Sequence, residues 1–282
     1  MTTTLRPAGP LQQTTDGSRS RAYDICVNSR PVGRIDLATD PGFGPTAGVI
    51  RSLRVDEPDR GRGRGTVAVL AAEEVLRGWG CDQVLIAVPA GAGVALRMAT
   101  ALGYTERGRA MAKRLDPASA GRPAPPPGVT FRPMTGAEFD VWSARSLAAY
   151  ARGWADRGAS EAQARSRAEA GRRENLPDGP VTEGATFHLA EHDGAVVGHL
   201  WTGRHHDTPD ATGRYVFDIE VVEGRRGRGY GRALMRFAER IALERGERAV
   251  ALHVFADNAP ALRLYESLGY ATTRVDAYKR LL

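Results

Sequence analysis

Apolar and polar residues follow two different periods along the chain, and these periods predict strands in some segments and amphipathic helices in others. Short β-branched runs bounded by turn residues indicate strands, and His192-Asp193-Gly194 predicts a hairpin turn between two of them. One helix face is marked by apolar residues at helical spacing: Leu234, Phe237, Ala238, Ile241 and Ala242. In the second half we expect strands at about 129–133, 186–191, 195–204, 214–222, 249–255 and 270–281, and helices near 136–151, 160–175, 230–245 and 259–268.

The same order of elements occurs twice. Residues 50–104 and 217–270 both run as strand, Arg/Gly-rich loop, amphipathic helix, glycine, strand, helix and Leu-Gly-Tyr. A repeat of this length indicates a duplicated domain, because the periods of solenoid repeats are much shorter. The segments that align are Arg60–Gly65 with Arg226–Gly231, and Ala95–Tyr104 with Ala261–Tyr270.

Composition predicts where the domains divide. Residues 116–128 contain five prolines, which remove backbone donors and fix φ, so this segment is expected to be a semi-rigid linker. Residues 1–20 are rich in Thr, Gln, Ser, Gly and Pro and are expected to be a flexible tail. We therefore predict domains at 21–115 and 129–282. The first contains a hairpin at about 22–37 and is truncated, with no room for the opening strand and two helices of the second.

Length, charge and cysteine usage narrow the class of protein. The chain has 282 residues, 42% hydrophobic and 26% charged, which is typical of a globular protein with two domains. No segment has the length of a membrane span and the start lacks the apolar core of a signal peptide, so we predict a cytoplasmic protein with no membrane partner. Cys26 and Cys81 are expected to be buried small hydrophobes.

Nearly all of the basic residues are arginines. The net charge is +6, and Lys113 and Lys279 are the two lysines among 39 basic residues, so 37 are arginines. Arginine binds phosphate in a bidentate fork, which makes a phosphate-bearing ligand plausible, but net charge alone does not indicate a nucleic-acid partner. The adjacent His205 and His206, next to Asp207, have no third ligand at helix or hairpin spacing, so we predict no metal.

One loop and one strand carry the candidate chemistry. The glycines of Arg225–Arg232 allow close approach of a ligand to the backbone, and the following helix start presents free N–H groups to an anion. On the strand before it, a period of two puts Phe217, Ile219 and Val221 on one face, and Val216, Asp218, Glu220 and Val222 on the other. Two carboxylates on one face of a core strand are costly unless they border a polar cleft.

Arg226-Gly-Arg-Gly-Tyr-Gly231 resembles the acyl-CoA pyrophosphate loop of the GCN5-related N-acetyltransferases, the GNAT superfamily. Asp257–Tyr270 resembles that family's second motif, Asn-x-x-Ala-x-x-x-Tyr followed by Gly-Phe/Tyr, and the two motifs stand at the family's separation. The resemblance implies an α/β protein of two tandem GNAT-like domains, the first truncated. Each domain would be a mixed sheet with helices on both faces, splayed between its fourth and fifth strands to admit the pantetheine of acetyl-CoA.

The resemblance also implies roles for single residues. Tyr265 would protonate the departing CoA thiolate, and Glu220 would remove the proton of the amine, directly or through water. Asp218 is the alternative binder of the acceptor's ammonium group, and His253 is a second candidate base. The cofactor contacts implied are Ile219, Val221, Val222, Arg226, Gly227, Arg228, Gly229, Tyr230, Gly231, Arg232 and Asn258, and the acceptor pocket would be lined by Asp218, Tyr150, Trp154, His199 and Trp201.

The first copy keeps the loop but not the chemistry. Arg60, Gly61, Gly63 and Gly65 make it a candidate second CoA loop. The catalytic positions differ, with Ala99 in place of Tyr265, Ala92 in place of Asn258 and Arg54 in place of Glu220. An alanine cannot protonate a thiolate, so we expect a degenerate domain that transfers no acyl group.

The resulting hypothesis is an N-acetyltransferase that moves an acetyl group from acetyl-CoA to a primary amine of a small molecule, by direct attack in a ternary complex. The alternatives are a protein or peptide N-acetyltransferase and a non-catalytic CoA-sensing or interaction module. We expect a monomer or homodimer with no nucleic-acid partner. The sequence does not name the amine.

Overall fold

The computed structural model describes residues 2–15, 17–40, 46–117, 125–156, 159–205 and 213–281. Most of the predicted proline-rich linker lies outside this part of the chain, as do His206 and Asp207. The chain forms two compact units, which are described separately. Unit 1 comprises residues 1–107, 157–167 and 274–282, and unit 2 comprises residues 108–156 and 168–273.

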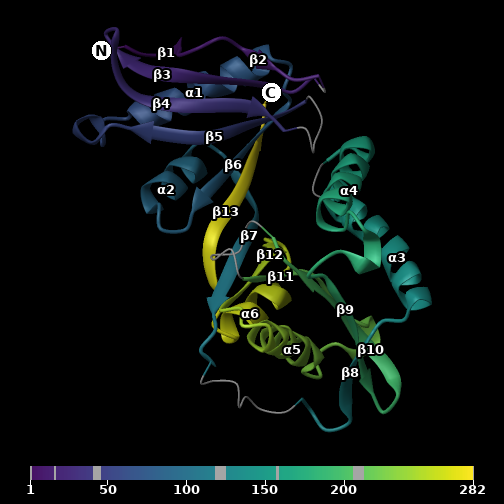
Figure 1. Ribbon diagram of the computed structural model, residues 1–282. Helices are drawn as coiled ribbons and strands as arrows, with labels where there is room; N and C mark the ends of the chain where they lie inside the picture. The colour runs from purple at the N-terminus through teal and green to yellow at the C-terminus, as the bar shows by residue number, and fades with distance from the viewer. Residues whose placement is uncertain are drawn as a thin grey trace. The chain divides into compact units, whose positions relative to one another are not determined.

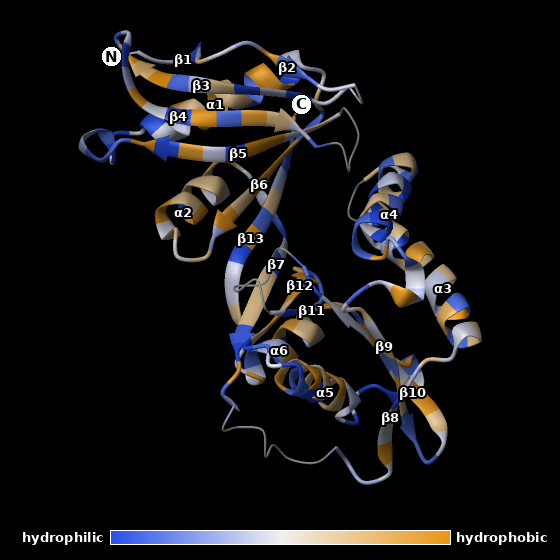
Figure 2. Cartoon of the chain, viewed as in Figure 1, coloured by the Kyte–Doolittle hydropathy of each residue, from blue (hydrophilic) through white to orange (hydrophobic). Residues whose placement is uncertain are grey.

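Unit 1 is a six-stranded sheet in the order β1-β3-β4-β5-β6-β13, with the short β2 pairing β3 (Figure 1). Hydrophobic and hydrophilic residues alternate along its strands (Figure 2), because one face packs on α1. Both cysteines are buried, as predicted. The elements are β1 (Thr3–Pro7), β2 (Gln12–Gln13), β3 (Arg19–Val27), β4 (Arg30–Thr39), β5 (Ala47–Val55), α1 (Arg64–Gly78), β6 (Gln83–Pro89), α2 (Gly93–Ala101) and the end of β13 (Ala271–Arg280).

The prediction of a flexible tail at residues 1–20 is wrong for the two strands that it contains. Strand β1 pairs antiparallel with β3, with Thr3 opposite Val27, and Leu5 packs against the core. An edge strand is held by backbone hydrogen bonds, which need no apolar run in the sequence. Unit 1 therefore has an opening strand after all, whereas the described residues between β1 and β3 contain no helix, in agreement with the predicted truncation.

Unit 2 is a six-stranded sheet in the order β7-β12-β11-β10-β9-β8. The predicted face of α5 is buried against it, with Leu234, Ala238 and Ala242 fully buried. The predicted α/β class with a mixed sheet is confirmed. The elements are β8 (Val129–Pro133), α3 (Gly136–Ala155), β9 (Thr186–His192), β10 (Ala195–Gly203), β11 (Arg214–Val221), α5 (Tyr230–Glu244), β12 (Ala249–Phe255) and α6 (Ala259–Ser267), together with the parts of β7 (Thr105–Arg114) and α4 (Glu161–Asn175) that follow residues 107 and 167.

The last strand of each repeat completes the sheet of the other unit. Residues Gly108–Arg114 of β7 follow the first repeat but pair with β12 in unit 2, and Arg274–Arg280 of β13 follow the second repeat but pair with β6 in unit 1. A sheet edge with unpaired N–H and C=O groups is a liability, and each exchanged strand covers one.

The two lysines of the chain hold these exchanged strands. Lys113 on β7 lies 2.7 Å from buried Glu239 on α5, and Lys279 on β13 lies 2.7 Å from Glu73 on α1. The lysine side chains are 14% and 24% exposed, and their partners 1% and 6%. Removing one partner of such a pair leaves a buried charge, so each pair fixes the strand that carries it.

Candidate active site

The loop between β11 and α5 has the backbone that an anion site requires. Gly227 and Gly229 have φ values of +77° and +84°, a left-handed region that other residues rarely adopt. No described atom lies within 4 Å of the position that a Cβ would take at either glycine, so the space above the loop is open. Helix α5 begins at Tyr230, directly after the loop, and its free N–H groups face that space. The donor set fits a pyrophosphate.

Side chains around the loop serve to hold its shape. The Tyr230 side chain is buried, and its hydroxyl shares a short hydrogen bond with Nδ1 of His192. Nε of Arg226 donates to the carbonyl of Val221 at 3.2 Å, and a guanidinium nitrogen of Arg232 donates to Oγ of Ser267 at 2.6 Å. Tyr230 is one of the predicted cofactor contacts, and because its side chain is occupied in this way, only its backbone is available to a ligand.

Strands β11 and β12 separate as the resemblance predicts. Their parallel pairing runs from Arg214 opposite Val250 to Val216 opposite Leu252 and ends there. The edge of β11 beyond that point, which includes Ile219 and Val221, has no strand partner on that side among the described residues. An edge of free backbone groups can pair with the amides of an extended ligand.

The predicted alternation along β11 is broken by a bulge. The register passes from Trp201 opposite Asp218 to Thr202 opposite Val216, so Phe217 is an extra residue. Its ring stacks on Trp201 at 4.4 Å, on the same side as Asp218, while Val216 packs in the core with α5. The predicted faces are thus wrong for Val216 and Phe217, since sequence periodicity carries no sign of a bulge.

Asp218 is the centre of the polar site. One carboxylate oxygen, Oδ2, accepts hydrogen bonds from Nε1 of Trp142 at 3.0 Å, from Oγ of Ser146 at 3.1 Å and from Nε2 of His199 at 3.0 Å. Burial by itself raises the pKa of Asp218, but the hydrogen bond and charge of His199 and the bonds from Trp142 and Ser146 outweigh it, so the pKa is lowered. Asp218 is held as a carboxylate.

Tyr265 lies near this carboxylate. Its side chain is buried, and burial, followed by the negative charge of Asp218, raises the pKa of its hydroxyl to about 12. Tyr265 therefore keeps its proton at neutral pH. Glu220 is more exposed: its side chain is 46% accessible, and its Oε2 lies 4.0 Å from Nε2 of His199.

Helix α3 supplies two partners of Asp218 that the sequence reasoning missed. Trp142 and Ser146 precede Tyr150 and Trp154, two predicted pocket residues, at a constant spacing of four residues. That spacing places all four on one face of the helix, so extending the stripe backwards would have found them. The ring of Trp142 also lies 5.6 Å from Trp201 and 6.2 Å from His199.

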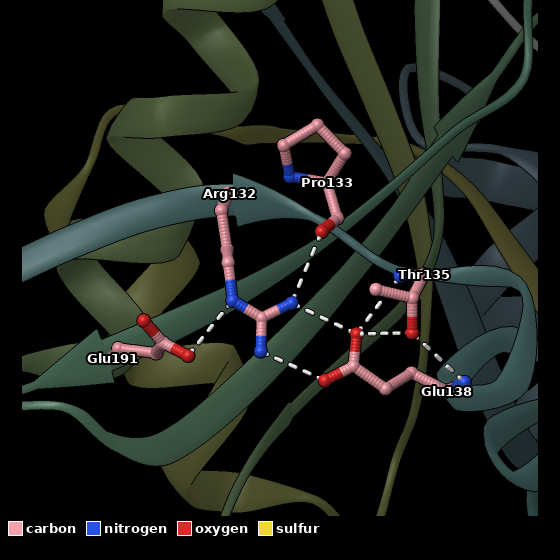
Figure 3. A network of polar contacts seen from close by, with 5 residues as sticks. All are labelled: Arg132, Pro133, Thr135, Glu138 and Glu191. Atoms are coloured by element: carbon pink, nitrogen blue, oxygen red, sulfur yellow. Dashed lines mark hydrogen bonds and ion pairs between the residues drawn. The ribbon is translucent and has the colours of Figure 1, made fainter.

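A charged network fixes the start of α3 (Figure 3). Arg132 on β8 donates two hydrogen bonds to Glu138 and one, at 2.8 Å, to Glu191 on β9. Glu138 and Thr135 also form a capping box at the first turn of the helix. The hydrogen bond from Arg132, followed by those from Thr135, lowers the pKa of Glu138 to about 2. The network anchors the helix that carries Trp142 and Ser146.

The other predicted site residues make packing or capping contacts in unit 2. Tyr150 contacts Trp154 edge-on at 6.0 Å, and Trp154 contacts Phe255 at the end of β12 at 5.4 Å, so they form a separate aromatic cluster. The ring of His253 lies against the backbone of Gly108 on β7, which fits a packing role better than that of a base. Asn258 caps α6, because its Oδ1 accepts from the backbone N–H of Ala261 at 3.2 Å.

A surface cavity of about 290 Å³ lies beside Phe217, near the end of α4. Carboxylates dominate its charged lining, with Glu174, Asp178 and Glu183 against Arg204. No helix among the described residues is both long and apolar enough to cross a membrane.

A glycine loop that fits a pyrophosphate, a splayed sheet and a buried tyrosine near a carboxylate are together consistent with an acyltransferase of the GNAT fold. The model of the acetyltransferase (GNAT) family matches residues 4–104 and 149–270, so the chain belongs to this family, with one match in each repeat. The predicted tandem form is confirmed.

Particular relatives are similar along nearly the whole chain. The chain is 32% identical to a mycothiol acetyltransferase of Frankia casuarinae, over 94% of this chain and 77% of that protein. It is 30% identical to a mycothiol acetyltransferase of Streptomyces avermitilis, over 86% and 73%. The tandem layout is thus similar to that of mycothiol synthase.

Solved structures support the fold. A GCN5-related N-acetyltransferase from Sphaerobacter thermophilus superposes with a TM-score of 0.58 at 23% identity, over 92% of this chain and 80% of that one. A tandem GNAT protein from the clavulanic acid biosynthesis pathway superposes with a TM-score of 0.50 at 21% identity, over 93% and 83%. At these identities the likeness concerns the fold alone.

Proposed function

We propose that this acyltransferase moves an acetyl group from acetyl-CoA to a primary amine of a small molecule, and that unit 2 carries out the reaction. The observation that carries the proposal is the buried hydroxyl of Tyr265 near the Asp218 carboxylate, in the unit whose β11 edge and Arg226–Arg232 loop are both open. Acetyl-CoA, when bound, supplies an activated thioester; the protein must place, deprotonate and protonate groups around it.

The chain's own residues divide this work. Backbone N–H groups of Arg226–Arg232 would hold the pyrophosphate, and the free edge at Ile219–Val222 would pair with the pantetheine amides. A backbone N–H near Val221 would polarise the thioester carbonyl. Tyr265 would give its proton to the leaving sulfur, and its high pKa keeps that proton in place until it is needed.

The acceptor side favours a small cationic amine. Asp218 and Glu220 both face the site, and an ammonium group is attracted by their charges. Trp142, Trp201 and Phe217 form an aromatic wall beside them. The relatives that match most of the chain are named mycothiol acetyltransferases, which supports a small-molecule acceptor.

The role of Glu220 as the base stays a prediction. Its partly exposed carboxylate is placed to attract the ammonium of the acceptor, and it can also take up a proton directly or through water. The candidate second CoA loop in unit 1, Arg60–Gly65, is likewise a prediction.

A panel of amines tests the function. Purified protein is incubated with acetyl-CoA and single acceptors, including the unacetylated precursor of mycothiol, polyamines, amino acids and a lysine peptide, while release of free CoA thiol is followed. We expect release with at least one small amine and a matching mass gain of one acetyl group on it. Transfer to the peptide alone would favour the peptide alternative, and thiol release without an acetylated amine would indicate hydrolysis.

A further inference from the structure

The proposed function requires a group that removes a proton from the acceptor's ammonium, and the polar site contains a better-placed base than the one that the sequence predicts. We propose that His199 accepts this proton at Nδ1, and that Asp218 positions its ring. This inference rests on the proposed function and deepens it, since it assigns His199 a catalytic role in place of pocket lining.

Asp218 is poorly suited to be the base itself. Its Oδ2 already accepts from Trp142, Ser146 and His199, all within 3.1 Å. Each bond stabilises the charged form, and protonation of that oxygen would break them. An acid held in this way acts through the group it orients, as the aspartate of a Ser-His-Asp triad does.

The bond to Asp218 also selects the tautomer of His199. A carboxylate only accepts, so the ring nitrogen 3.0 Å from Oδ2, which is Nε2, carries a hydrogen. In a neutral imidazole the other nitrogen then holds a free lone pair. The basic atom of His199 is therefore Nδ1.

Nδ1 of His199 can be reached. The side chain is 17% exposed, and Nδ1 is not among the buried polar atoms that lack a partner. No hydrogen bond to it occurs within the described ranges, so it is open to solvent or to an acceptor. Nδ1 of His188, one strand away on β9, is by contrast buried, and burial lowers the pKa of that ring to about 4.

The charged groups that contact His199 within the described ranges both lie on one strand. Asp218 and Glu220 lie on β11, and the charge of Asp218 reaches Tyr265 on α6. Helix α3 contributes the uncharged Trp142 and Ser146, and Leu189 is the residue of β9 paired with His199. A positive charge that develops on the ring during proton transfer would be attracted by these two carboxylates.

The protons balance. The ammonium gives one proton to Nδ1 of His199, and the freed nitrogen lone pair forms a bond to the acetyl carbon. The carbon–sulfur bond breaks, its electron pair stays on sulfur, and sulfur takes the proton of Tyr265. The tyrosinate then recovers the second proton of the former ammonium, and His199 releases the first to solvent. The products are an amide, a CoA thiol and one proton.

The test compares His199→Gln with Glu220→Gln in the full-length protein. The amide nitrogen of Gln can still donate to Asp218, so the site keeps its shape but loses the basic atom. With an acceptor found in the panel, we expect His199→Gln to lower kcat about 10²-fold or more, with acetyl-CoA affinity unchanged. Glu220→Gln should lower kcat less than about tenfold and raise KM for the amine.

Two further readouts separate a base from a structural residue. The dependence of kcat on pH should differ between the wild type and His199→Gln, and an unchanged pH profile would contradict a role of His199 as the base. Added imidazole should restore part of the turnover of His199→Ala but not that of Tyr265→Phe.

The proposals fail in distinguishable ways. If the wild type acetylates an amine and His199→Gln stays within about threefold of it, or Glu220→Gln carries the large loss, His199 is not the base. If the wild type acetylates no amine at all, the proposed function falls, and the His199 inference falls with it.

Discussion

The candidate phosphate loops of the two units have nearly the same backbone. Gly61 and Gly63 have φ values of +70° and +72°, close to the +77° and +84° of Gly227 and Gly229. Nε of Arg60 donates to the carbonyl of Val55, just as Nε of Arg226 donates to the carbonyl of Val221, the matching residue of unit 2. The pairing of β5 with β6 also ends early, at Ile50 opposite Ile86.

The units differ on the face where the acceptor would bind. Gly33 and Gly198 occupy equivalent places, because a Cβ at either would collide with the backbone of the neighbouring strand. Counting from them, the register matches four positions of unit 1 with four of unit 2: Arg34 with His199, Asp36 with Trp201, Ser52 with Asp218, and Arg54 with Glu220. Two arginines thus face each other where unit 2 has a histidine and a carboxylate.

This difference separates the predicted anion-binding loop from the predicted chemistry. The loop is built from glycines and backbone N–H groups, which are present in both copies. The chemistry depends on a few side chains, and Arg34 and Arg54 would repel an ammonium group.

The largest effect is expected from deleting residues 1–115, which removes β7 along with most of unit 1. Because β7 pairs with β12, unit 2 would lose a strand of its own sheet and the partner of Glu239. We expect no cooperative unfolding transition and little soluble protein. Deleting residues 1–104 keeps β7 and should preserve more folded protein. Circular dichroism measures the folded content of the two deletion variants, which should differ. If the two variants unfold in the same way, β7 does not stabilise unit 2.

Tyr265→Phe tests the chemical difference. The change removes one hydroxyl from unit 2, and Ala99 offers no substitute in unit 1, so turnover should fall about 10²-fold or more while acetyl-CoA binding stays nearly intact. Steady-state kinetics and calorimetric titration measure the two quantities. Turnover within a few-fold of the wild type would mean that another acid serves the sulfur.

Gly229→Val and Gly63→Val form a matched pair in the two loops. A β-branched residue at these left-handed positions strains the backbone and fills the open space above it, at a cost of about 2 kcal/mol. We expect Gly229→Val to weaken acetyl-CoA binding about 30-fold. Gly63→Val should leave turnover unchanged, and a large loss of turnover in a folded Gly63→Val protein would contradict a silent unit 1.

The smallest effect concerns the helix caps. Asn258 caps α6, whereas Ala92 at the equivalent place gives α2 no side-chain cap. Asn258→Ala should destabilise the protein by about 1 kcal/mol and Ala92→Asn should stabilise it by a similar amount, as judged from denaturant unfolding. If Asn258→Ala lowers the free energy of acetyl-CoA binding by more than it lowers the free energy of unfolding, the predicted contact of Asn258 with pantetheine is supported.

Much of this architecture could be predicted from the sequence, because local patterns determine it. The expected helix at 259–268 and strand at 249–255 match α6 and β12 within one residue. The role of Asp218 as a hydrogen-bond centre could not be predicted, since its partners lie on α3 and β10, far away in the chain. The bulge at Phe217 and the strand β1 also depend on pairing between strands rather than on local pattern.

The exchanged strands impose an order in time on the synthesis of the protein. Strand β6 is complete once Pro89 has been translated, but its partner in unit 1 ends at Arg280, close to the end of the chain. At about 5–20 residues per second, the ribosome needs roughly 10 to 40 s to make the intervening residues. During that interval the edge of β6 that will pair with β13 remains without its strand partner. The half of the molecule that emerges first is therefore finished last.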